Sequence, residues 1–322
     1  MYRSRERGVA LITALLVVAL AVVAAASMAS RQQLDIRRTG NLLHGEQAWA
    51  YVTGAESWAR VVLERDLRDS TFDTLEEDWS TRPPASIVEG GLVTGCILDL
   101  QGRFNLNSLV ESTGQFNPDA VDRYKRLLVG LGLDPELADT LVDWMDVDIN
   151  ARLAGAEDDY YLLQEPVYRA ANRPLANLSE LRLVKGYDAK AVALLEPHVS
   201  ALPDPRAPLN VNTASAEALL TVAANLSLMD TQKIVDDREA RPDKGFNDIS
   251  DFETLPVLAG KPLDLTTLSI QSEWFALLAS SYVGQGRAQL TAQVHRSTTG
   301  TEVVQRRREY ADGLTCDRPV AE

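Results

Sequence analysis

The residues MYRSRERG (1–8) and VALITALLVVALAVVAAASMA (9–29) meet at a sharp boundary, and this boundary decides how the chain is organised. The second segment has no charged residue, and a helix of about 20 apolar residues crosses the hydrocarbon core of a bilayer. The first segment has three arginines and one glutamate, and loops rich in basic residues stay in the cytoplasm. We therefore predict a single membrane-spanning helix, with its N-terminal side in the cytoplasm and the remaining chain outside.

A cleaved secretory signal is the alternative interpretation of the same hydropathy. Such a signal combines a basic start, a shorter apolar core and small residues at the cleavage site. Residues 24–30 (AAASMAS) supply small residues of this kind. Hydropathy alone leaves both interpretations open.

The boundary favours the membrane-spanning helix over a cleaved secretory signal, because the charged leader ends in Gly8 and the apolar run starts at Val9 without a gap. This arrangement resembles the class III leader of type IV pilins and type II secretion pseudopilins. The resemblance implies that a prepilin peptidase cuts between Gly8 and Val9, and that the new N-terminus is methylated. It also implies that residues 9–30 first anchor the chain in the membrane and then form the core of a filament.

Thr13 departs from the pattern of this family. Most members have glutamate at the fifth position of the mature chain, which here is Thr13. In the family that carboxylate is thought to neutralise the N-terminal ammonium of the preceding subunit, since a buried ammonium without a partner is costly. A subunit with no neighbour ahead of it does not need the carboxylate. The absence resembles the large minor pseudopilins of the protein K type, which sit at the filament tip.

Composition and charge fit an exported, mainly globular protein. The 322 residues, 45% of them hydrophobic and 24% charged, suffice for about two folded domains. The net charge of -14 disfavours binding of nucleic acid and favours binding of divalent cations. Cys96 and Cys316 fall on the predicted extracytoplasmic side, where a disulfide is permitted, but the sequence leaves their pairing open.

The remaining pattern predicts an α+β, pilin-like fold. A long helix is expected from Val9 to about Asp66, and its second half should pack on a sheet. The packing face carries Ala48, Val52, Ala55, Ala59 and Val62. Strands are expected at residues 92–100, 274–283, 287–295 and 301–310, the last three as an antiparallel meander, and residues 71–91 as a loop. The pilin-like domain would comprise residues 31–108 and 270–322.

Residues 109–269 are expected to form a large, mainly α-helical insertion domain, divided by the proline-rich residues 203–208. Its helix candidates are residues 120–131, 135–145, 179–183, 189–195, 214–224 and 231–238. The halves begin with similar tetrapeptides, NLNS (105–108) and NVNT (210–213), which indicates a weak repeat.

The second half also resembles the helix-hairpin-helix modules of DNA-uptake proteins. In such modules a glycine hairpin exposes backbone N–H groups to phosphate. The corresponding hairpin, residues 225–229, has no glycine. The first half has glycines at Gly130 and Gly132, but acidic residues surround them, namely Asp134, Glu136, Asp139 and Asp143. We therefore favour a packing role over DNA binding for both helix-hairpin-helix-like halves.

An acidic stretch is the strongest candidate for a metal site. Residues 143–150 (DWMDVDIN) precede residues 155–161 (GAEDDYY). The first, third, fifth and twelfth positions of an EF-hand spacing are filled by Asp146, Asp148, Asn150 and Glu157. However, Ala151 occupies the position of the required glycine, and no flanking helix pair is evident, so an EF-hand proper is not expected. A solvated acidic loop is the alternative.

The resemblance to the protein K type favours calcium, because that family binds calcium through acidic residues of its helical domain and has a similar acidic run. The ligand set that it implies is Asp146, Asp148, Asn150, Glu157 and Asp159, with Asp143 and Asp158 in reserve.

No catalytic motif is evident, because the three histidines are scattered and no nucleophile elbow or phosphate-binding loop is present. We therefore predict a protein that is not an enzyme. The resemblance implies a minor pseudopilin that caps the tip of the type II secretion pseudopilus and helps to initiate assembly and export of folded proteins. It would be anchored in the inner membrane with a periplasmic C-terminal domain.

The partners that the resemblance implies are the minor pseudopilins of types I and J, the major pseudopilin and the prepilin peptidase. A membrane-anchored DNA-uptake protein and a tip-like minor pilin of a type IV pilus are the alternatives.

Overall fold

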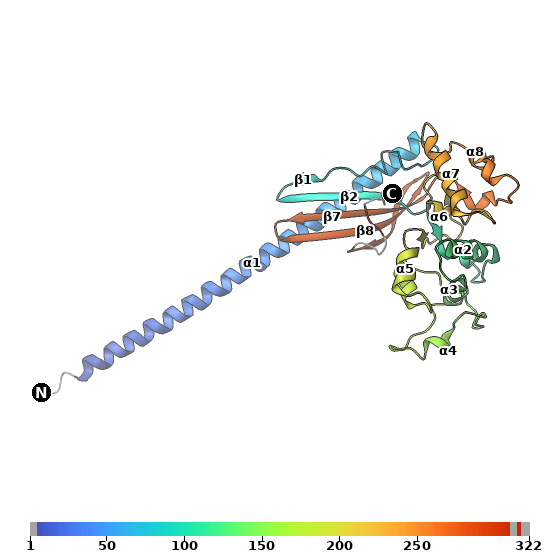
Figure 1. The fold of residues 1–322 in the computed structure, drawn as a ribbon. Coiled ribbons are helices and arrows are strands. Elements are labelled where there is room, and N and C mark those ends of the chain that lie inside the picture. Colours follow the sequence, from blue (N-terminus) through green and yellow to red (C-terminus); the bar gives the residue numbers. More distant parts are fainter. Residues whose placement is uncertain (1–4, 310–313, 317–322) are drawn as a thin grey trace.

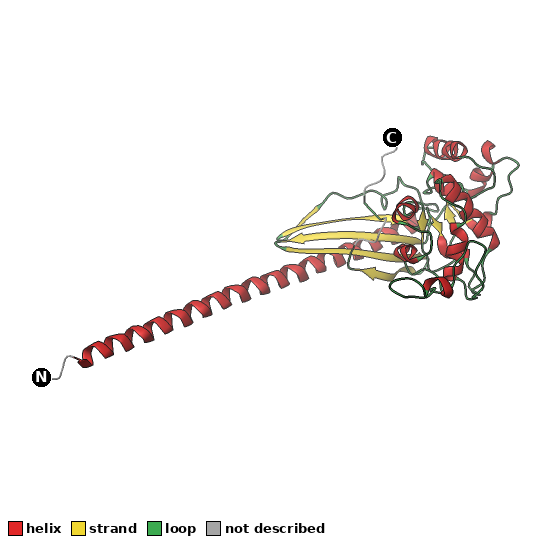
Figure 2. Ribbon diagram, turned by 60° about the horizontal axis from the view of Figure 1, so that its bottom comes forward, coloured by secondary structure: helices red, strands yellow, loops and turns green. Residues whose placement is uncertain are grey.

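A single helix dominates the computed structural model, which describes residues 5–309 and 314–316. Helix α1 (Arg5–Asp69) is 65 residues long and has no break. Its first half extends away from the rest of the molecule, and its second half lies along the sheet (Figures 1 and 2). The predicted helix from Val9 to about Asp66 is therefore confirmed, whereas Met1 to Ser4 of the leader lie outside the described residues.

The second half of α1 packs on the sheet through the face that the periodicity predicts. Ala48, Val52 and Ala59 are buried there, and Leu63 joins them one turn further on. Because small residues alternate with larger ones on this face, the helix backbone can approach the strands closely. Burial of this face fixes α1 to the sheet through the hydrophobic effect.

The sheet is antiparallel and five-stranded, in the order β1-β2-β7-β8-β9. Its strands are β1 (Ser86–Val88), β2 (Gly91–Asp99), β7 (Trp274–Val283), β8 (Gly286–Ser297) and β9 (Gly300–Arg307). The predicted strand at residues 92–100 and the C-terminal meander are confirmed, with Tyr310 outside the described residues. Strand β1 corrects the expectation of a continuous loop at residues 71–91. Three residues are too few for a period-two pattern, so only the hairpin with β2 defines this strand.

The helices gather at the end of the sheet that is remote from the start of α1 (Figure 1). They are α2 (Pro118–Gly130), α3 (Leu137–Met145), α4 (Asp158–Tyr161), α5 (Ala189–Leu195), α6 (Ala216–Leu219), α7 (Leu228–Ala240) and α8 (Ile249–Glu253), with 3-10 helices at Leu106–Leu109, Leu178–Leu183, Pro256–Leu258 and Leu265–Thr267. The α+β fold class is thus confirmed.

Helix α6 is much shorter than the helix predicted at residues 214–224. Ser215 caps its start by accepting a hydrogen bond from the backbone N–H of Ala218. After Leu219 the backbone continues in tighter turns, in which Thr221 N–H donates to Ala218 O and Val222 N–H to Leu219 O. The apolar periodicity continues through this region, but the hydrogen-bond pattern is no longer that of an α-helix.

The weak sequence repeat has a structural counterpart. Two parallel pairs of two-residue strands occur, β3 (Phe104–Asn105) with β4 (Val199–Ser200), and β5 (Leu209–Asn210) with β6 (Leu268–Ser269). Each pair therefore joins the beginning of one half to its end. Each half also has its own hydrophobic core, built from residues 104–199 in the first and 209–268 in the second.

A buried asparagine fastens each half internally. Asn107 accepts a hydrogen bond from the N–H of Leu175 at 2.8 Å and donates to Leu202 O at 2.9 Å. Asn212 accepts from the N–H of Phe246 at 2.7 Å and donates to its carbonyl at 2.9 Å. Each amide thus satisfies backbone groups of a distant loop that would otherwise be buried without partners.

Candidate functional site

The acidic stretch forms a loop between two helices of the first half. Helix α3 ends at Met145, so Asp146 directly follows it, and Glu157 directly precedes α4. The expectation that no helix pair flanks the stretch is therefore wrong. Helix α4 has only four residues, which is too short to produce a recognisable apolar period.

Three of the expected ligands converge in this loop. Asp146, Asp148 and Glu157 each present a carboxylate oxygen, and these oxygens lie within 4.8 Å of one another. Asp146 and Glu157 are buried, whereas Asp148 is exposed. The buried atoms Asp146 Oδ1 and Glu157 Oε1 have no hydrogen-bond partner within the described structure. Converging carboxylates, two of which have a buried oxygen without a hydrogen-bond partner, form a donor set that suits a hard divalent cation.

The electrostatics of the loop show how strongly the carboxylates oppose one another. Burial raises the pKa of Glu157 to about 7, and Asp143, Asp146 and Asp148 add to this shift. Burial likewise raises the pKa of Asp143 to about 6, with a further contribution from Asp146. The pKa of Asp146 is raised for the same reasons. The negative charges of these carboxylates are only partly balanced by positive charge, and a bound cation would supply the remainder.

Arg152 compensates part of this charge, and sequence reasoning did not single it out. Its Nε lies 3.3 Å from Asp143 Oδ1, and its terminal nitrogen lies 3.6 Å from Asp146 Oδ2. The guanidinium also stacks on the Phe116 ring at 3.9 Å from the centroid. One guanidinium faces several carboxylates here, so the cluster retains a negative charge.

Gly155 allows the loop to close around Asp143. A Cβ atom at Gly155 would lie 1.8 Å from Asp143 Oδ2, so any side chain there would displace the carboxylate. The same oxygen accepts a hydrogen bond from the Arg152 N–H at 3.0 Å. Asp143 thus holds the loop in place through the backbone of Arg152, and it shares the Arg152 guanidinium with Asp146.

The other expected ligands lie apart from the three convergent carboxylates. Asp158 pairs with Arg169 at 2.7 Å, and Asp159 accepts a hydrogen bond from the N–H of Tyr160. Asn150 lies beside Asp148, to which its Nδ2 donates at 3.0 Å. The structure thus brings Asp146, Asp148 and Glu157 together, with Asn150 adjacent.

A second group of acidic residues, Asp66, Asp73 and Glu77, lies at the C-terminal end of α1 and in the segment that follows it. The buried side chain of Arg296 from β8 binds two of them, with N–O distances of 2.7 Å to Asp66 and to Asp73 Oδ1. Glu77 accepts hydrogen bonds from Trp79 Nε1 and the Thr74 N–H. An arginine therefore occupies the position that a cation would take, and this cluster is an internal ion-pair network.

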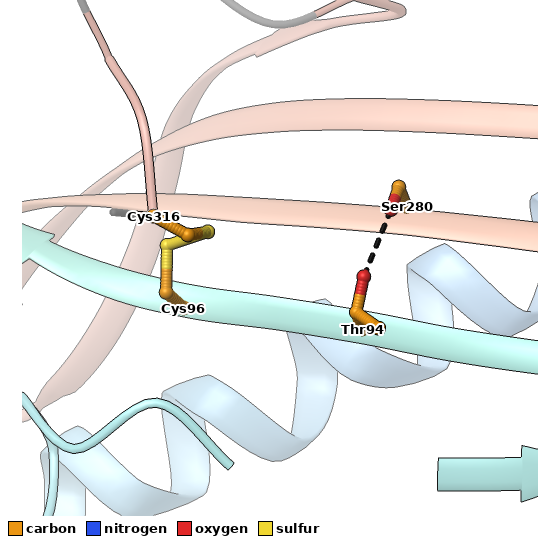
Figure 3. Close-up of a disulfide and its surroundings, with 4 residues drawn as sticks. All are labelled: Thr94, Cys96, Ser280 and Cys316. Carbon is orange, nitrogen blue, oxygen red and sulfur yellow. Dashed lines mark hydrogen bonds between the residues drawn. A yellow bond between two sulfur atoms is a disulfide. The ribbon is translucent and has the colours of Figure 1, made fainter. Parts of the chain in front are cut away.

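The C-terminal segment is attached covalently to the sheet. Cys316 forms a disulfide with Cys96 of β2, with the two Cα atoms 5.7 Å apart (Figure 3). Figure 3 also shows Thr94 and Ser280 of β7, whose hydroxyl oxygens are hydrogen-bonded at 2.9 Å across the two strands. Leu314 packs next to the bridge in the hydrophobic cluster on this face.

The apolar part of α1 is long and apolar enough to cross a membrane, and none of its most hydrophobic window is buried in the molecule. The hydroxyl of Thr13 is hydrogen-bonded to the carbonyls of Val9 and Ala10, at 3.1 and 3.0 Å. This bonding lets a polar residue sit in an apolar segment. The hydroxyl proton of Thr13 is therefore used within α1, and the side chain has no carboxylate.

Comparison with known proteins shows the relationships of this chain. Family models described as "Type II secretion system (T2SS), protein K" match residues 102–204 and 209–271. Type II secretion system protein K of Pseudomonas aeruginosa is 40% identical over 92% of this chain and 91% of its own length. The protein of the same name from Klebsiella pneumoniae is 33% identical over 94% of this chain and 96% of its own length.

A solved structure resembles the fold closely. A chain of the GspK-GspI-GspJ complex from enterotoxigenic Escherichia coli aligns with a TM-score of 0.74 and 28% identity, covering 85% of this chain and all of that one. Fold and relatives together define the class of protein, a minor pseudopilin of the type II secretion system. Within this class, the chain belongs to the type II secretion system protein K family.

Proposed function

We propose that this protein caps the tip of the type II secretion pseudopilus, and that it helps to start pseudopilus assembly and the export of folded proteins. The observation that carries the proposal is the likeness to the GspK-GspI-GspJ complex over the whole of one of its chains. Two features of this chain support it. Thr13 provides no carboxylate for a subunit ahead. The helices form a bulky mass at the end remote from the start of α1 (Figure 1).

The partners follow from the same likeness. A related chain was crystallised with GspI and GspJ, so minor pseudopilins of types I and J are the proposed direct neighbours. The major pseudopilin would be reached through them. Cleavage after Gly8 by the prepilin peptidase would release the N-terminal amine of Val9. This amine would form an ion pair with the glutamate of the next subunit down.

The proposed location is the inner membrane, with the C-terminal domain in the periplasm. The single apolar helix supplies one membrane span, and the basic residues before it favour a cytoplasmic N-terminus. The Cys96–Cys316 disulfide supports an oxidising compartment for the folded part.

Calcium is the proposed cofactor of the acidic loop, with Asp146, Asp148 and Glu157 as the core of the ligand set. Asn150 and the exposed Asp159 would complete it after small movements of the loop. Bound calcium would supply positive charge that fixes the loop between α3 and α4. This role is structural, in keeping with a protein that is not an enzyme.

Counting and localising this chain in assembled filaments tests the proposal. A fluorescent label on the C-terminal domain should appear as one spot at one end of each pseudopilus, and co-expression with the type I and J subunits should yield a stable complex. Labels spread along the filament would contradict the tip role. Tight, salt-sensitive binding of DNA by the purified chain would instead favour the DNA-uptake alternative.

A further inference from the structure

A cavity of about 470 Å³ lies between the two helical halves. Helix α2 of the first half forms one wall, and residues 222–224 and 262–267 of the second half contribute to the other. Arg103, Arg123, Arg126 and Arg206 line this cavity. Asp119, Asp122 and Asp264 line the same cavity, so its four arginines exceed its three carboxylates by one charge in a chain with a net charge of -14.

Two of these arginines meet at a single acceptor. Arg123 Nε donates to the carbonyl oxygen of Thr221 at 3.2 Å, and a terminal nitrogen of Arg126 donates to the same oxygen at 2.8 Å. Arg126 Nε also donates to Leu220 O at 3.3 Å. Two like charges are thus held side by side, with one neutral carbonyl between them, and both reach from the first half to the second.

Carboxylates do not relieve this repulsion at close range. Within the part of the chain that the structure describes, neither Arg123 nor Arg126 forms an ion pair. Burial lowers the pKa of Arg123 to about 10, and the positive charge of Arg126 contributes, whereas the more distant Asp264 opposes the shift. The pKa of Arg126 is lowered by burial as well. Asp122 opposes the shift of the Arg126 pKa, as Asp264 does for Arg123. The two guanidiniums therefore have carboxylates nearby but none in direct contact, which partly buried arginines normally have.

The geometry leaves donors free for a ligand. Arg123 uses only Nε in its hydrogen bond to Thr221, so both terminal nitrogens remain, and one terminal nitrogen of Arg126 remains as well. The guanidinium of Arg123 lies over the Phe104 ring at 5.7 Å from the centroid, which holds it in place. Arginine forks recognise carboxylate and phosphate groups through paired N–H donors.

We propose that this cavity binds a small oxyanion, a carboxylate or phosphate group, through Arg123 and Arg126, and that binding locks the two helical halves together. Both arginines already bridge the halves through Thr221, so an anion between them would turn a repulsive pair into a clamp. A volume of about 470 Å³ lies within the range of small-molecule sites. Asp119, Asp122 and Asp264 of the same lining would repel an extended polyanion, which favours a compact ligand.

The test measures the Tm of the full chain as the concentration of sodium phosphate or of disodium succinate is raised. The chain is kept in non-ionic detergent without added calcium, and NaCl holds the ionic strength constant. We expect a saturable rise in Tm of about 2–4 °C at roughly tenfold excess over Kd. Phosphate and succinate as separate arms distinguish the two oxyanion sources. Calorimetric titration of the same protein gives Kd directly.

Variants locate the site independently of overall stability. Arg126→Gln should weaken anion affinity at least about tenfold, because it removes a charge-assisted contact, and Arg123→Lys should weaken it less. Lys125→Gln is the matched control on the same helix, since Lys125 pairs with Asp139 at 3.2 Å and does not line the cavity. The control should bind like the unmodified chain.

Three outcomes would overturn the proposal. They are a Tm that follows ionic strength alone, an equal anion response in the Arg126→Gln variant and the unmodified chain, and binding of duplex DNA at these arginines without binding of either small anion. None of these outcomes bears on the tip role, which is judged from filaments.

Discussion

At the scale of single residues, the acidic loop shows how spacing and environment act together. Asp146 and Glu157 are eleven positions apart by their numbering, yet their buried oxygens converge with that of Asp148. Asp158 and Asp159 are equally acidic in sequence, but each has a local partner in the structure. The environment of each carboxylate, and not its presence, therefore determines which ones are available to a metal ion.

Replacing the convergent carboxylates should abolish the response to calcium. We expect millimolar CaCl2 to raise the Tm of the unmodified chain, and Asp148→Ala and Glu157→Ala each to remove most of that rise, because binding to the folded state alone stabilises it. Asp159→Ala should remove a smaller part of the rise, because Asp159 lies outside the three convergent carboxylates. Differential scanning calorimetry in detergent measures it. An unchanged Tm of the unmodified chain with calcium would exclude a structural calcium site.

The raised pKa of Glu157 predicts an unusual dependence of stability on pH without calcium. Its folded value of about 7 exceeds its ordinary value of 4.5, so the folded chain keeps a proton that the unfolded chain releases between these values. The stabilisation is complete below the ordinary value and is lost as the pH rises through the folded value.

Comparison with Glu157→Gln isolates this effect, because glutamine does not titrate. In the presence of a chelator, the Tm of the unmodified chain should fall relative to that of the variant between about pH 5 and about pH 7.5. Saturating calcium should remove this difference between the two proteins in how Tm changes with pH. Parallel Tm profiles for the two proteins in chelator would show that Glu157 titrates normally.

At the scale of elements, Arg296 and the disulfide join parts of the chain that are distant in sequence. Arg296 of β8 ties the end of α1, through Asp66, to the following segment, through Asp73. The disulfide ties the C-terminal segment to β2 across a separation of 220 residues. Both links therefore join segments that precede and follow the helical residues between β2 and β7 in the sequence.

Removing Arg296 should destabilise the pilin-like part strongly. Arg296→Leu removes the cationic partner of the buried Asp73 and of the partly buried Asp66, and breaking a buried ion pair in this way costs about 3–5 kcal/mol. Arg287→Leu, on the same strand but exposed, is the matched control and should cost much less. Urea unfolding followed by tryptophan fluorescence compares them. Equal midpoints for the two variants would contradict the importance of this network.

At the scale of the whole molecule, the chain has an apolar end and a bulky helical end, separated by the length of α1 and the sheet (Figure 1). An apolar segment that is fully exposed in the isolated chain requires a membrane or neighbouring helices. The opposite end is closed by two helical halves with separate cores. This polarity suits a subunit that ends a filament.

Thr13→Glu tests the division of roles within α1. Under the proposed cleavage between Gly8 and Val9, processing should remain intact, because the peptidase would recognise the leader ending at Gly8, and the mature form should accumulate as in the unmodified chain. Gly8→Val is the control and should accumulate as precursor. Electrophoresis of membrane fractions separates the two forms. Accumulated precursor in the Thr13→Glu variant would show that position 13 takes part in processing.

The long helix, the meander and the acidic stretch are predictable from sequence, because each depends on periodicity or spacing along a continuous segment. The sequence also indicated the repeat through the paired asparagines, Asn107 and Asn212. Which carboxylates converge depends on contacts between distant segments, since Arg152, Arg169 and the close approach of Gly155 distinguish acidic residues that look alike in sequence. The partners of Arg296 and of the arginines on α2 also lie far away in the sequence, so the sequence pattern does not reveal them. Burial and charge neighbours come from segments far apart in the chain, and local patterns do not record them.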